Sequence, residues 1–201
     1  MSEPETPGPQ TPGQGQARRP KVAVLAGVAA LVLALDATSK ALVVANLTPG
    51  EPVHVIGNIL EWNLLRNPGA AFSVGTSYTV IFTLLAIGVV GYVVRTARRL
   101  RSTSYAIAFG LLLGGASGNL ADRLLRAPGV LRGNVVDWIE VTRYYPVFNL
   151  ADSAICCAGV LFVVLVMLGY RTDGTRAGRS APVRPAPSEE ANDGETVDVE
   201  R

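Results

Sequence analysis

The sequence predicts an all-α membrane protein in which four transmembrane helices carry a small β-structure on one side. Hydrophobic residues make up 49% of the 201 residues and charged residues only 17%, a balance too apolar for an ordinary soluble domain. A helix needs roughly 20 residues to cross about 30 Å of hydrocarbon. Four segments are long and apolar enough, and we place the spans at about 21–45, 78–94, 104–125 and 150–170.

The first span, at about 21–45, is apolar except for four residues, Asp36, Thr38, Ser39 and Lys40. Basic residues precede it, as they also precede the apolar part of a secretory signal peptide. The apolar stretch is long, however, a polar segment comes before the basic residues, and no small-x-small cleavage site leads into a mature domain. We therefore interpret this segment as a retained transmembrane helix.

The other three spans differ in where their polar residues lie. The second reads YTVIFTLLAIGVVGYVV and has no charged residue. The third begins purely apolar and ends in GGASGNLADRLL. The fourth, LADSAICCAGVLFVVLVMLGY, carries one acidic residue, Asp152, at its start. A carboxylate next to lipid costs a few kcal/mol on insertion scales, so its presence needs a reason.

The segments outside the spans fall into two kinds. The loops 46–77 and 126–149 contain short runs rich in Val, Ile, Leu and Trp between Gly, Pro and Asn residues, which indicates strands and turns. We expect them to form a small β-structure that lies on the helical bundle. The two ends, 1–20 and 172–201, are rich in Pro and polar residues. They cannot bury enough apolar surface to offset their ordering entropy, so we predict disordered tails.

The distribution of basic residues predicts the orientation. Four spans place both termini on the same side of the membrane, and the positive-inside rule assigns an excess of Lys and Arg to the cytoplasm. One side collects the following basic residues: Arg18, Arg19, Lys21, Arg95, Arg98, Arg99, Arg101, Arg171 and Arg176. The first loop on the other side has only Arg66, whereas the second loop has several basic residues that acidic residues partly offset. Both termini are therefore expected in the cytoplasm.

With this orientation, polar residues from all parts of the chain converge on the outer membrane boundary. The outer ends of the spans and the outer loops hold Asp36, Lys40, Asn67, Asn119, Asp122, Arg123, Asp137, Asn149 and Asp152. A proton or ion pathway would string such groups across the membrane. Convergence at one depth is instead typical of a reaction site that is open both to water and to a substrate embedded in lipid.

The charged residues of the first and third spans also have structural interpretations. Asp36 and Lys40 are four residues apart and could form an intrahelical pair whose lysine reaches outward to the water. Arg123 could pair with Asp122 and fix the end of the third span. On this interpretation the four residues stabilise the helices and take no part in chemistry.

Most of the remaining polar residues have structural interpretations as well. Asn119 and Asn149 could simply hydrogen-bond between helices, and Asn67 could be a turn residue. Asp152 could cap the fourth span, but Asn149 already offers a cap three residues earlier. Asp137, which lies between Val-Val and Trp-Ile, is hard to explain as a structural residue.

Two facing carboxylates would have a defined chemistry. If Asp137 and Asp152 lie close together in a poorly hydrated site, they cannot both ionise cheaply, and the pair holds one proton. The ionised partner can take a proton from water, and the protonated partner can donate one to a carbonyl oxygen, as in aspartic proteases. The residues therefore favour a membrane aspartyl peptidase that acts near the outer surface.

Composition excludes several other classes. The net charge is only +2 and no basic stripe is interleaved with aromatic residues, which excludes a nucleic-acid-binding protein. The single histidine, His54, lies in a polar loop, so a multi-histidine metal site is excluded, as is a nucleophile paired with histidine. The GxGD motif of another class of membrane aspartyl protease is absent. The alternatives that stay open are a membrane transporter and a scaffold with intramembrane carboxylates.

Five segments in order resemble one known family. DATSK in the first span, RNPGAAFS in the first outer loop, GGASGNLADRLL, NVVDWIEV and FNLADSAI are similar to the successive motifs of lipoprotein signal peptidase, also called signal peptidase II. The resemblance runs from about Asp36 to Ile155. Each motif alone is weak evidence, whereas five of them in the family's order are specific.

The resemblance implies an enzyme of the bacterial cytoplasmic (inner) membrane, with four helices and an extracytoplasmic β-cradle. Such an enzyme removes signal peptides from diacylglyceryl-modified prolipoproteins by cutting N-terminal to the lipidated cysteine. It implies that Asp137 and Asp152 are the catalytic dyad. It further implies that the other polar residues of the outer boundary shape the site or hold the substrate. We expect no metal and no cofactor, lipid-modified prolipoproteins and membrane lipid as partners, and a monomer.

Overall fold

Four helices and a three-stranded sheet make up the part of the chain that the computed structural model describes, residues 19–69, 79–142 and 145–177. The elements are α1 (Val22–Asn46), β1 (Val53–Ile56), β2 (Leu60–Asn67), α2 (Thr79–Ala97), α3 (Thr103–Leu125), β3 (Val135–Val141) and α4 (Leu150–Met167). The predicted tails 1–20 and 172–201 lie largely outside the described residues, as does Tyr78, the predicted start of the second span.

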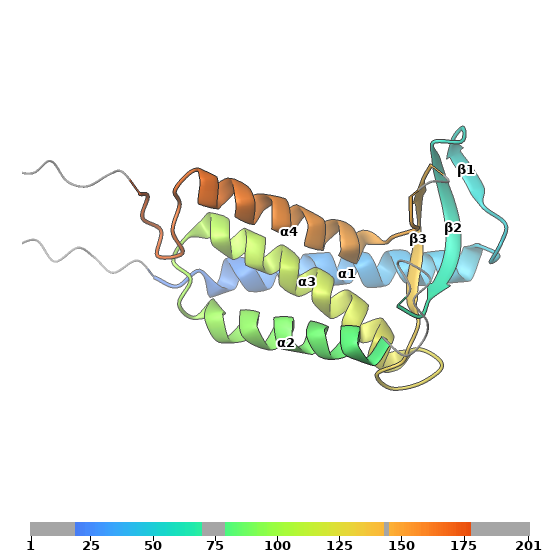
Figure 1. Ribbon diagram of the computed structural model, residues 1–201, viewed down its shortest axis with the longest axis horizontal. Helices are drawn as coiled ribbons and strands as arrows, with labels where there is room; N and C mark the ends of the chain where they lie inside the picture. Colours follow the sequence, from blue (N-terminus) through green and yellow to red (C-terminus); the bar gives the residue numbers. More distant parts are fainter. Residues whose placement is uncertain (1–18, 70–78, 143–144, 178–201) are drawn as a thin grey trace, which may run out of the picture.

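All four helices are long and apolar enough to cross a membrane, with mean hydropathies from 1.2 to 2.4. The predicted fold class, a four-helix membrane protein with a small sheet, is confirmed. Figure 1 shows the helices side by side along the long axis, with the sheet across one end and the start of α1 and the end of α4 at the other end. Helix α3 has the lowest mean hydropathy of the four helices. It also has the largest share of buried residues, because it packs against α1, α2 and α4.

Glycines allow α3 to occupy this central position. A Cβ on Gly114 would lie 2.6 Å from the Cβ of Val32 on α1, and a Cβ on Gly115 would lie 2.5 Å from the carbonyl oxygen of Ala151 on α4. Real Cβ atoms essentially never come so close to other atoms. Small residues at helix interfaces let backbones approach closely in a membrane. The glycines therefore bring three helices together at the level of the polar residues.

The sheet is antiparallel in the order β1-β2-β3 and covers the end of the bundle. Strand β2 pairs with β3 so that Asn67 lies opposite Val135 and Leu65 opposite Asp137. The sheet is anchored to α1 through an apolar cluster of Val43, Leu64 and Val136. Successive residues of a strand point to opposite faces, so the burial of Val136 in this cluster turns Asp137 to the other face of β3.

Two helix boundaries differ from the predicted ones by more than one residue. Helix α4 ends at Met167, three residues before the predicted end, because Gly169 has φ +72° and the Tyr170 amide donates to the Leu165 carbonyl oxygen at 2.9 Å. A glycine with positive φ commonly ends a helix in this way. Helix α2 continues past Val94 to Ala97. Arg95 in its last turn interacts favourably with the negative end of the helix dipole.

Candidate active site

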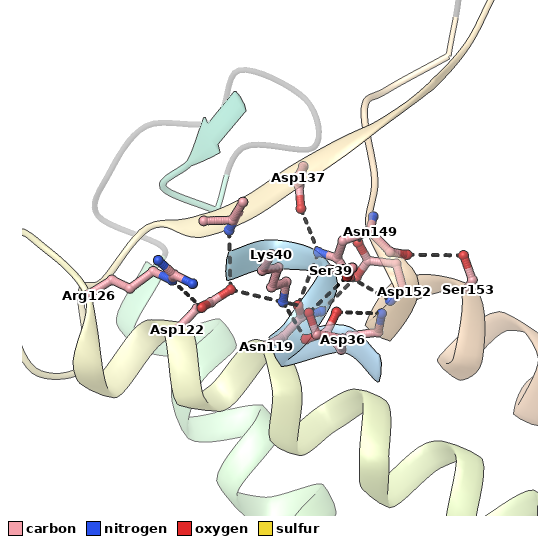
Figure 2. Close-up of polar contacts among 12 residues, drawn as sticks. Asp36, Ser39, Lys40, Asn119, Asp122, Arg126, Asp137, Asn149, Asp152 and Ser153 are labelled. Carbon is pink, nitrogen blue, oxygen red and sulfur yellow. Dashed lines mark hydrogen bonds and ion pairs between the residues drawn. The ribbon is translucent and has the colours of Figure 1, made fainter. Parts of the chain in front are cut away.

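Asn149 is the residue on which the two predicted catalytic carboxylates converge. It is fully buried and is the N-cap of α4, where its Oδ1 accepts a hydrogen bond from the Asp152 amide at 3.0 Å. The Asp152 carboxylate in turn accepts from the Asn149 amide at 3.2 Å, which completes a capping box. The Asn149 Nδ2 donates to Asp137 Oδ1 at 2.6 Å (Figure 2). One side chain therefore caps the helix that carries one carboxylate and binds the other.

Asp137 is 2% exposed and is held by two amide side chains. Its second oxygen accepts a hydrogen bond from Asn67 Nδ2 at 2.8 Å, and Asn67 Oδ1 accepts from the Gly69 amide at 2.8 Å. Asn67 thus has both roles considered for it, since it shapes the turn after β2 and reaches the site. Burial raises the pKa of Asp137 to about 6, with a smaller contribution from the Asp152 charge, and the Asn67 and Asn149 hydrogen bonds oppose this rise.

Asp152 is less buried than Asp137 and is held from α3. Its Oδ1 accepts a hydrogen bond from Asn119 Nδ2 at 2.7 Å. Asn119 Oδ1 accepts from Asn149 Nδ2 at 3.2 Å. Within the described residues no hydrogen bond joins the two carboxylates directly, and they are linked through Asn119 and Asn149. Both asparagines do connect helices, as the structural interpretation requires, and each also binds one of the two carboxylates.

Lys40 lies at the centre of a second group of polar residues below the dyad. Its Nζ lies 2.7 Å from Asp36 Oδ2, 2.9 Å from Asp122 Oδ2 and 3.0 Å from Asn119 Oδ1. The interpretation that Lys40 reaches outward to water is wrong, because the side chain is 1% exposed. Two carboxylates and an amide oxygen satisfy the ammonium inside the protein, so it gains nothing by extending to the surface.

The carboxylates bound by Lys40 each hold the backbone next to one member of the dyad. Asp36 Oδ1 accepts a hydrogen bond at 3.0 Å from the amide of Ala151, the residue before Asp152. Asp122 Oδ2 accepts at 3.2 Å from the amide of Val136, the residue before Asp137. Lys40 joins these two carboxylates, as Figure 2 shows for the labelled side chains. The Lys40 group therefore fixes the position of β3 relative to the start of α4.

The predicted pairing of Arg123 with Asp122 is wrong. Adjacent residues of a helix do not face each other, and Asp122 pairs instead with Lys40 and with Arg126, four residues away. Arg123 lies within electrostatic range of Asp137, Asp152 and Asp122. Its Nη1 is buried and has no hydrogen-bond partner among the described residues. The site therefore contains a positively charged donor that remains available.

Three residues of the site were not predicted from the sequence. Arg126 forms an ion pair with Asp122, and the spacing of four residues on a helix was the signal that could have found it. Gly133 packs against the end of α3, where its amide donates to the Arg123 carbonyl oxygen at 3.0 Å and a Cβ would collide with the Asp122 carbonyl oxygen. Gly118 leaves room for the Asp36 carboxylate, since a Cβ there would collide with Asp36 Oδ2.

Substituting Gly118 with alanine is expected to destabilise the protein, because the new Cβ would collide with Asp36 Oδ2, which is already bound by Lys40. Such overpacking costs about 1–3 kcal/mol. Thermal unfolding in detergent measures the effect. Gly88→Ala in α2 is the matched control, since a Cβ there meets nothing within 4 Å. An equal melting temperature for the two variants would show that Asp36 is not confined as described.

An apolar groove of about 330 Å³ lies between α1 and the sheet. Its walls include Leu42, Val43 and Leu47 of α1 together with Trp62 and Trp138 of the sheet. Trp138 follows Asp137 directly in β3. Among residues 19–69, 79–142 and 145–177, no three His, Cys, Asp or Glu side chains are grouped so that they could hold a metal ion.

Comparison with known proteins identifies the family. Residues 28–168 match the family described as signal peptidase (SPase) II, a range that includes every predicted site residue. The chain belongs to the signal peptidase II family. It is 54% identical over 161 residues to the lipoprotein signal peptidase of Rhodococcus jostii, which covers 80% of this chain and 79% of that protein. It is 48% identical over 170 residues to that of Mycobacterium avium, covering 85% and 92%.

Solved structures show the same fold. A bacterial membrane enzyme determined by the in meso method at 1.9 Å resolution superposes with a TM-score of 0.66 at 24% identity, covering 76% of this chain and 97% of that one. The resemblance to signal peptidase II noted in the sequence is therefore confirmed, and the chain is an aspartic-type peptidase. The transporter and scaffold alternatives find no support.

Proposed function

We propose that this signal peptidase II removes signal peptides from diacylglyceryl-modified prolipoproteins by cutting N-terminal to the lipidated cysteine, with Asp137 and Asp152 as its catalytic residues. The observation that carries the proposal is the convergence of both carboxylates on the buried Asn149. The names of the relatives, all lipoprotein signal peptidases, support the class of substrate.

In the proposed mechanism, Asp137 holds the proton that the dyad shares, because it is the more buried carboxyl group and burial raises its pKa. Ionised Asp152 takes a proton from a water molecule, whose oxygen attacks the carbonyl carbon of the scissile peptide. Asp137 gives its proton to the carbonyl oxygen, which yields a neutral tetrahedral intermediate. Collapse of the intermediate breaks the C–N bond: the proton taken up by Asp152 passes to the leaving amine, and one hydroxyl of the intermediate returns its proton to Asp137 as the C=O of the new carboxyl group forms. No covalent bond to the enzyme forms.

Arg123 is proposed to hold the substrate backbone. Its buried Nη1 donor has no partner among the described side chains, yet the guanidinium lies near both catalytic carboxylates. A buried donor without a partner costs free energy. A peptide carbonyl oxygen next to the scissile bond would remove this cost and position the bond between Asp137 and Asp152.

The apolar groove beside the dyad suits the lipid part of the substrate. Two polar side chains on its walls are engaged, since the Ser39 hydroxyl donates to the Asp36 carbonyl oxygen and the Asn46 amide group donates to the Leu42 carbonyl oxygen, whereas the buried Trp138 Nε1 has no hydrogen-bond partner among the described residues. The exposed lining of the groove is almost entirely hydrocarbon, which favours an acyl chain over a peptide. Trp138, which lines the groove, follows Asp137 directly in β3, but the two side chains point to opposite faces of the strand, so an acyl chain in the groove would lie across β3 from the dyad.

The proposed location is the bacterial cytoplasmic membrane, with both termini in the cytoplasm and the active site at the outer face. Arg95 lies in the last turn of α2, and Arg98, Arg99 and Arg101 lie between α2 and α3, at the end of the bundle opposite the sheet. An excess of basic residues marks the cytoplasmic side. The sheet and the dyad then lie at the outer boundary, where both water and the lipid-anchored substrate are available.

The function is tested with the purified full chain in phospholipid and two forms of one prolipoprotein, with and without the diacylglyceryl group. We expect the lipidated form to be cut on the N-terminal side of the modified cysteine, and the unlipidated form to be a poor substrate. Gel shift and mass spectrometry of the products measure both. No cleavage of the lipidated form, or a cut elsewhere, would refute the proposed function, whereas equal cleavage of both forms would refute the role of the groove.

The pH profile of kcat/KM is expected to fall as the pH rises through about 6, because Asp137 then loses the proton it must donate. Asn67→Ala removes a hydrogen bond that favours the ionised carboxylate, so the pKa of Asp137 rises and the falling limb moves to higher pH. Asn63→Ala is the matched control on the same strand, since Asn63 binds Glu140 at 2.8 Å. A profile that N67A leaves in place would contradict the assignment of the proton to Asp137.

A further inference from the structure

A second pocket, of about 580 Å³, lies at the end of the bundle opposite the sheet. The start of α1, the turn between α2 and α3, and the segment after α4 meet there. Backbone hydrogen bonds fix the three segments to one another: the Lys21 amide donates to the Leu100 carbonyl oxygen at 2.8 Å, and the Arg101 and Ser102 amides donate to the Thr172 carbonyl oxygen at 2.9 and 3.1 Å. The pocket is therefore a built part of the fold.

Three cationic side chains line this pocket: Arg19, Lys21 and Arg101. None of them forms an ion pair within the described part of the chain, where the ion pairs involve only Lys40, His54 and Arg126 as cations. Asp173 lies near the pocket in the sequence, but its carboxylate accepts from the Thr175 amide and hydroxyl at 2.8 and 2.7 Å. Among residues 19–69, 79–142 and 145–177, no neighbouring carboxylate therefore balances the positive charge of the pocket.

Neutral donors line the same pocket. Ser102 caps α3, and its Oγ accepts from the Tyr105 amide at 3.4 Å. Thr103 and Ser104, in the first turn of α3, also line the pocket. Their amides have no carbonyl four residues back within the helix to bind, and the N-terminal end of a helix attracts anions. The cavity, three unpaired cations and these donors all favour the same ligand, an anion with several oxygen atoms.

We propose that this pocket binds a phosphate group, either that of an anionic phospholipid headgroup or inorganic phosphate. The position of the pocket at the membrane boundary favours the lipid headgroup. Helix α1 begins at Val22, α3 begins at Thr103 and α4 ends at Met167, so the pocket lies where the apolar helices end and lipid headgroups begin. Basic pockets between transmembrane helices bind anionic headgroups in this way. The proposal concerns the end of the bundle remote from the dyad and does not depend on the proposed function.

The test compares two triple variants of the full chain that lose the same charge. Arg19→Gln/Lys21→Gln/Arg101→Gln removes the cations of the pocket, whereas Arg95→Gln/Arg98→Gln/Arg99→Gln removes three cations nearby that do not line it. Native mass spectrometry measures the apparent Kd for phosphatidylglycerol, and thermal unfolding in detergent measures its stabilisation relative to phosphatidylcholine. We expect the pocket variant to bind phosphatidylglycerol at least about tenfold more weakly than the control variant.

A third arm with inorganic phosphate distinguishes the two sources. Stabilisation of the wild type by phosphatidylglycerol but not by millimolar phosphate supports a lipid headgroup, whereas stabilisation by phosphate that only the pocket variant loses supports a soluble phosphate. Equal weakening of phosphatidylglycerol binding in the two triple variants, with no phosphate effect, overturns the site. Should the pocket variant unfold in phosphatidylcholine, the single variants Arg101→Gln and Arg98→Gln provide the same comparison.

Discussion

Replacing either Asp137 or Asp152 with asparagine is expected to lower kcat for prolipoprotein cleavage by a factor of about 10² to 10⁴ or more. Asparagine has nearly the volume of aspartate, but it can neither hold the shared proton nor take one from water. Asp137 is buried against Asn67 and Asn149, so a smaller residue would also leave a cavity, which asparagine avoids. Cleavage of the lipidated precursor by purified protein measures the loss.

The control for this experiment is Glu140→Gln, which removes a carboxylate from the same strand. Glu140 is three residues from Asp137 and binds Asn63, so the change alters the charge of β3 without touching the dyad. Thermal unfolding of all three variants in detergent separates lost chemistry from lost structure. Cleavage at the wild-type rate by either Asp→Asn variant would remove that residue from the mechanism.

Replacing Lys40 with methionine is expected to destabilise the protein by about 3–5 kcal/mol, because it leaves Asp36 and Asp122 as buried carboxylates without their shared cation. The same change should lower kcat, since those carboxylates hold the amides that precede Asp152 and Asp137. Denaturant unfolding in detergent micelles measures the stability, and precursor cleavage measures kcat.

Two further variants make this result specific. Arg98→Met removes an exposed cation between α2 and α3 that lines neither the site nor the basic pocket, and it should change both quantities little. Adding Asp36→Asn to Lys40→Met should restore part of the lost stability, because it removes one of the unpaired charges. A Lys40→Met protein as stable as the wild type would mean that Lys40 does not hold Asp36 and Asp122 together.

The fold was largely predictable because hydrophobic length and turn residues determine it locally. The runs that became α1 to α4 are apolar over the length that a bilayer demands, and NVVDWIEV has the pattern of a strand that became β3. The end of α4 was less predictable, because a glycine alone does not mark a helix end: Gly159 lies within α4. The helix ends just before Gly169, where φ is positive.

The members of the site were predictable, but their partners were not. Depth and orientation alone brought the nine polar residues to one boundary. Sequence spacing finds neighbours within one helix, such as Asp36 and Lys40, but it cannot show that Asp122 on α3 completes the same group. Nor can it show that Asn149 binds Asp137 across 12 residues of chain. These contacts depend on how α1, α3 and β3 pack, which glycines such as Gly114 decide.

The most direct test of the central claim, that Asp137 and Asp152 act as one unit, compares the double variant D137N/D152N with each single variant in single-turnover cleavage of the lipidated precursor. When two residues act together on one proton, changing either residue removes the function of both. The losses of rate in the two single variants are then grossly non-additive. We therefore predict a double variant about as slow as the slower single variant. Losses that multiply, so that the double variant is slower by the product of the two single effects, would contradict a shared role.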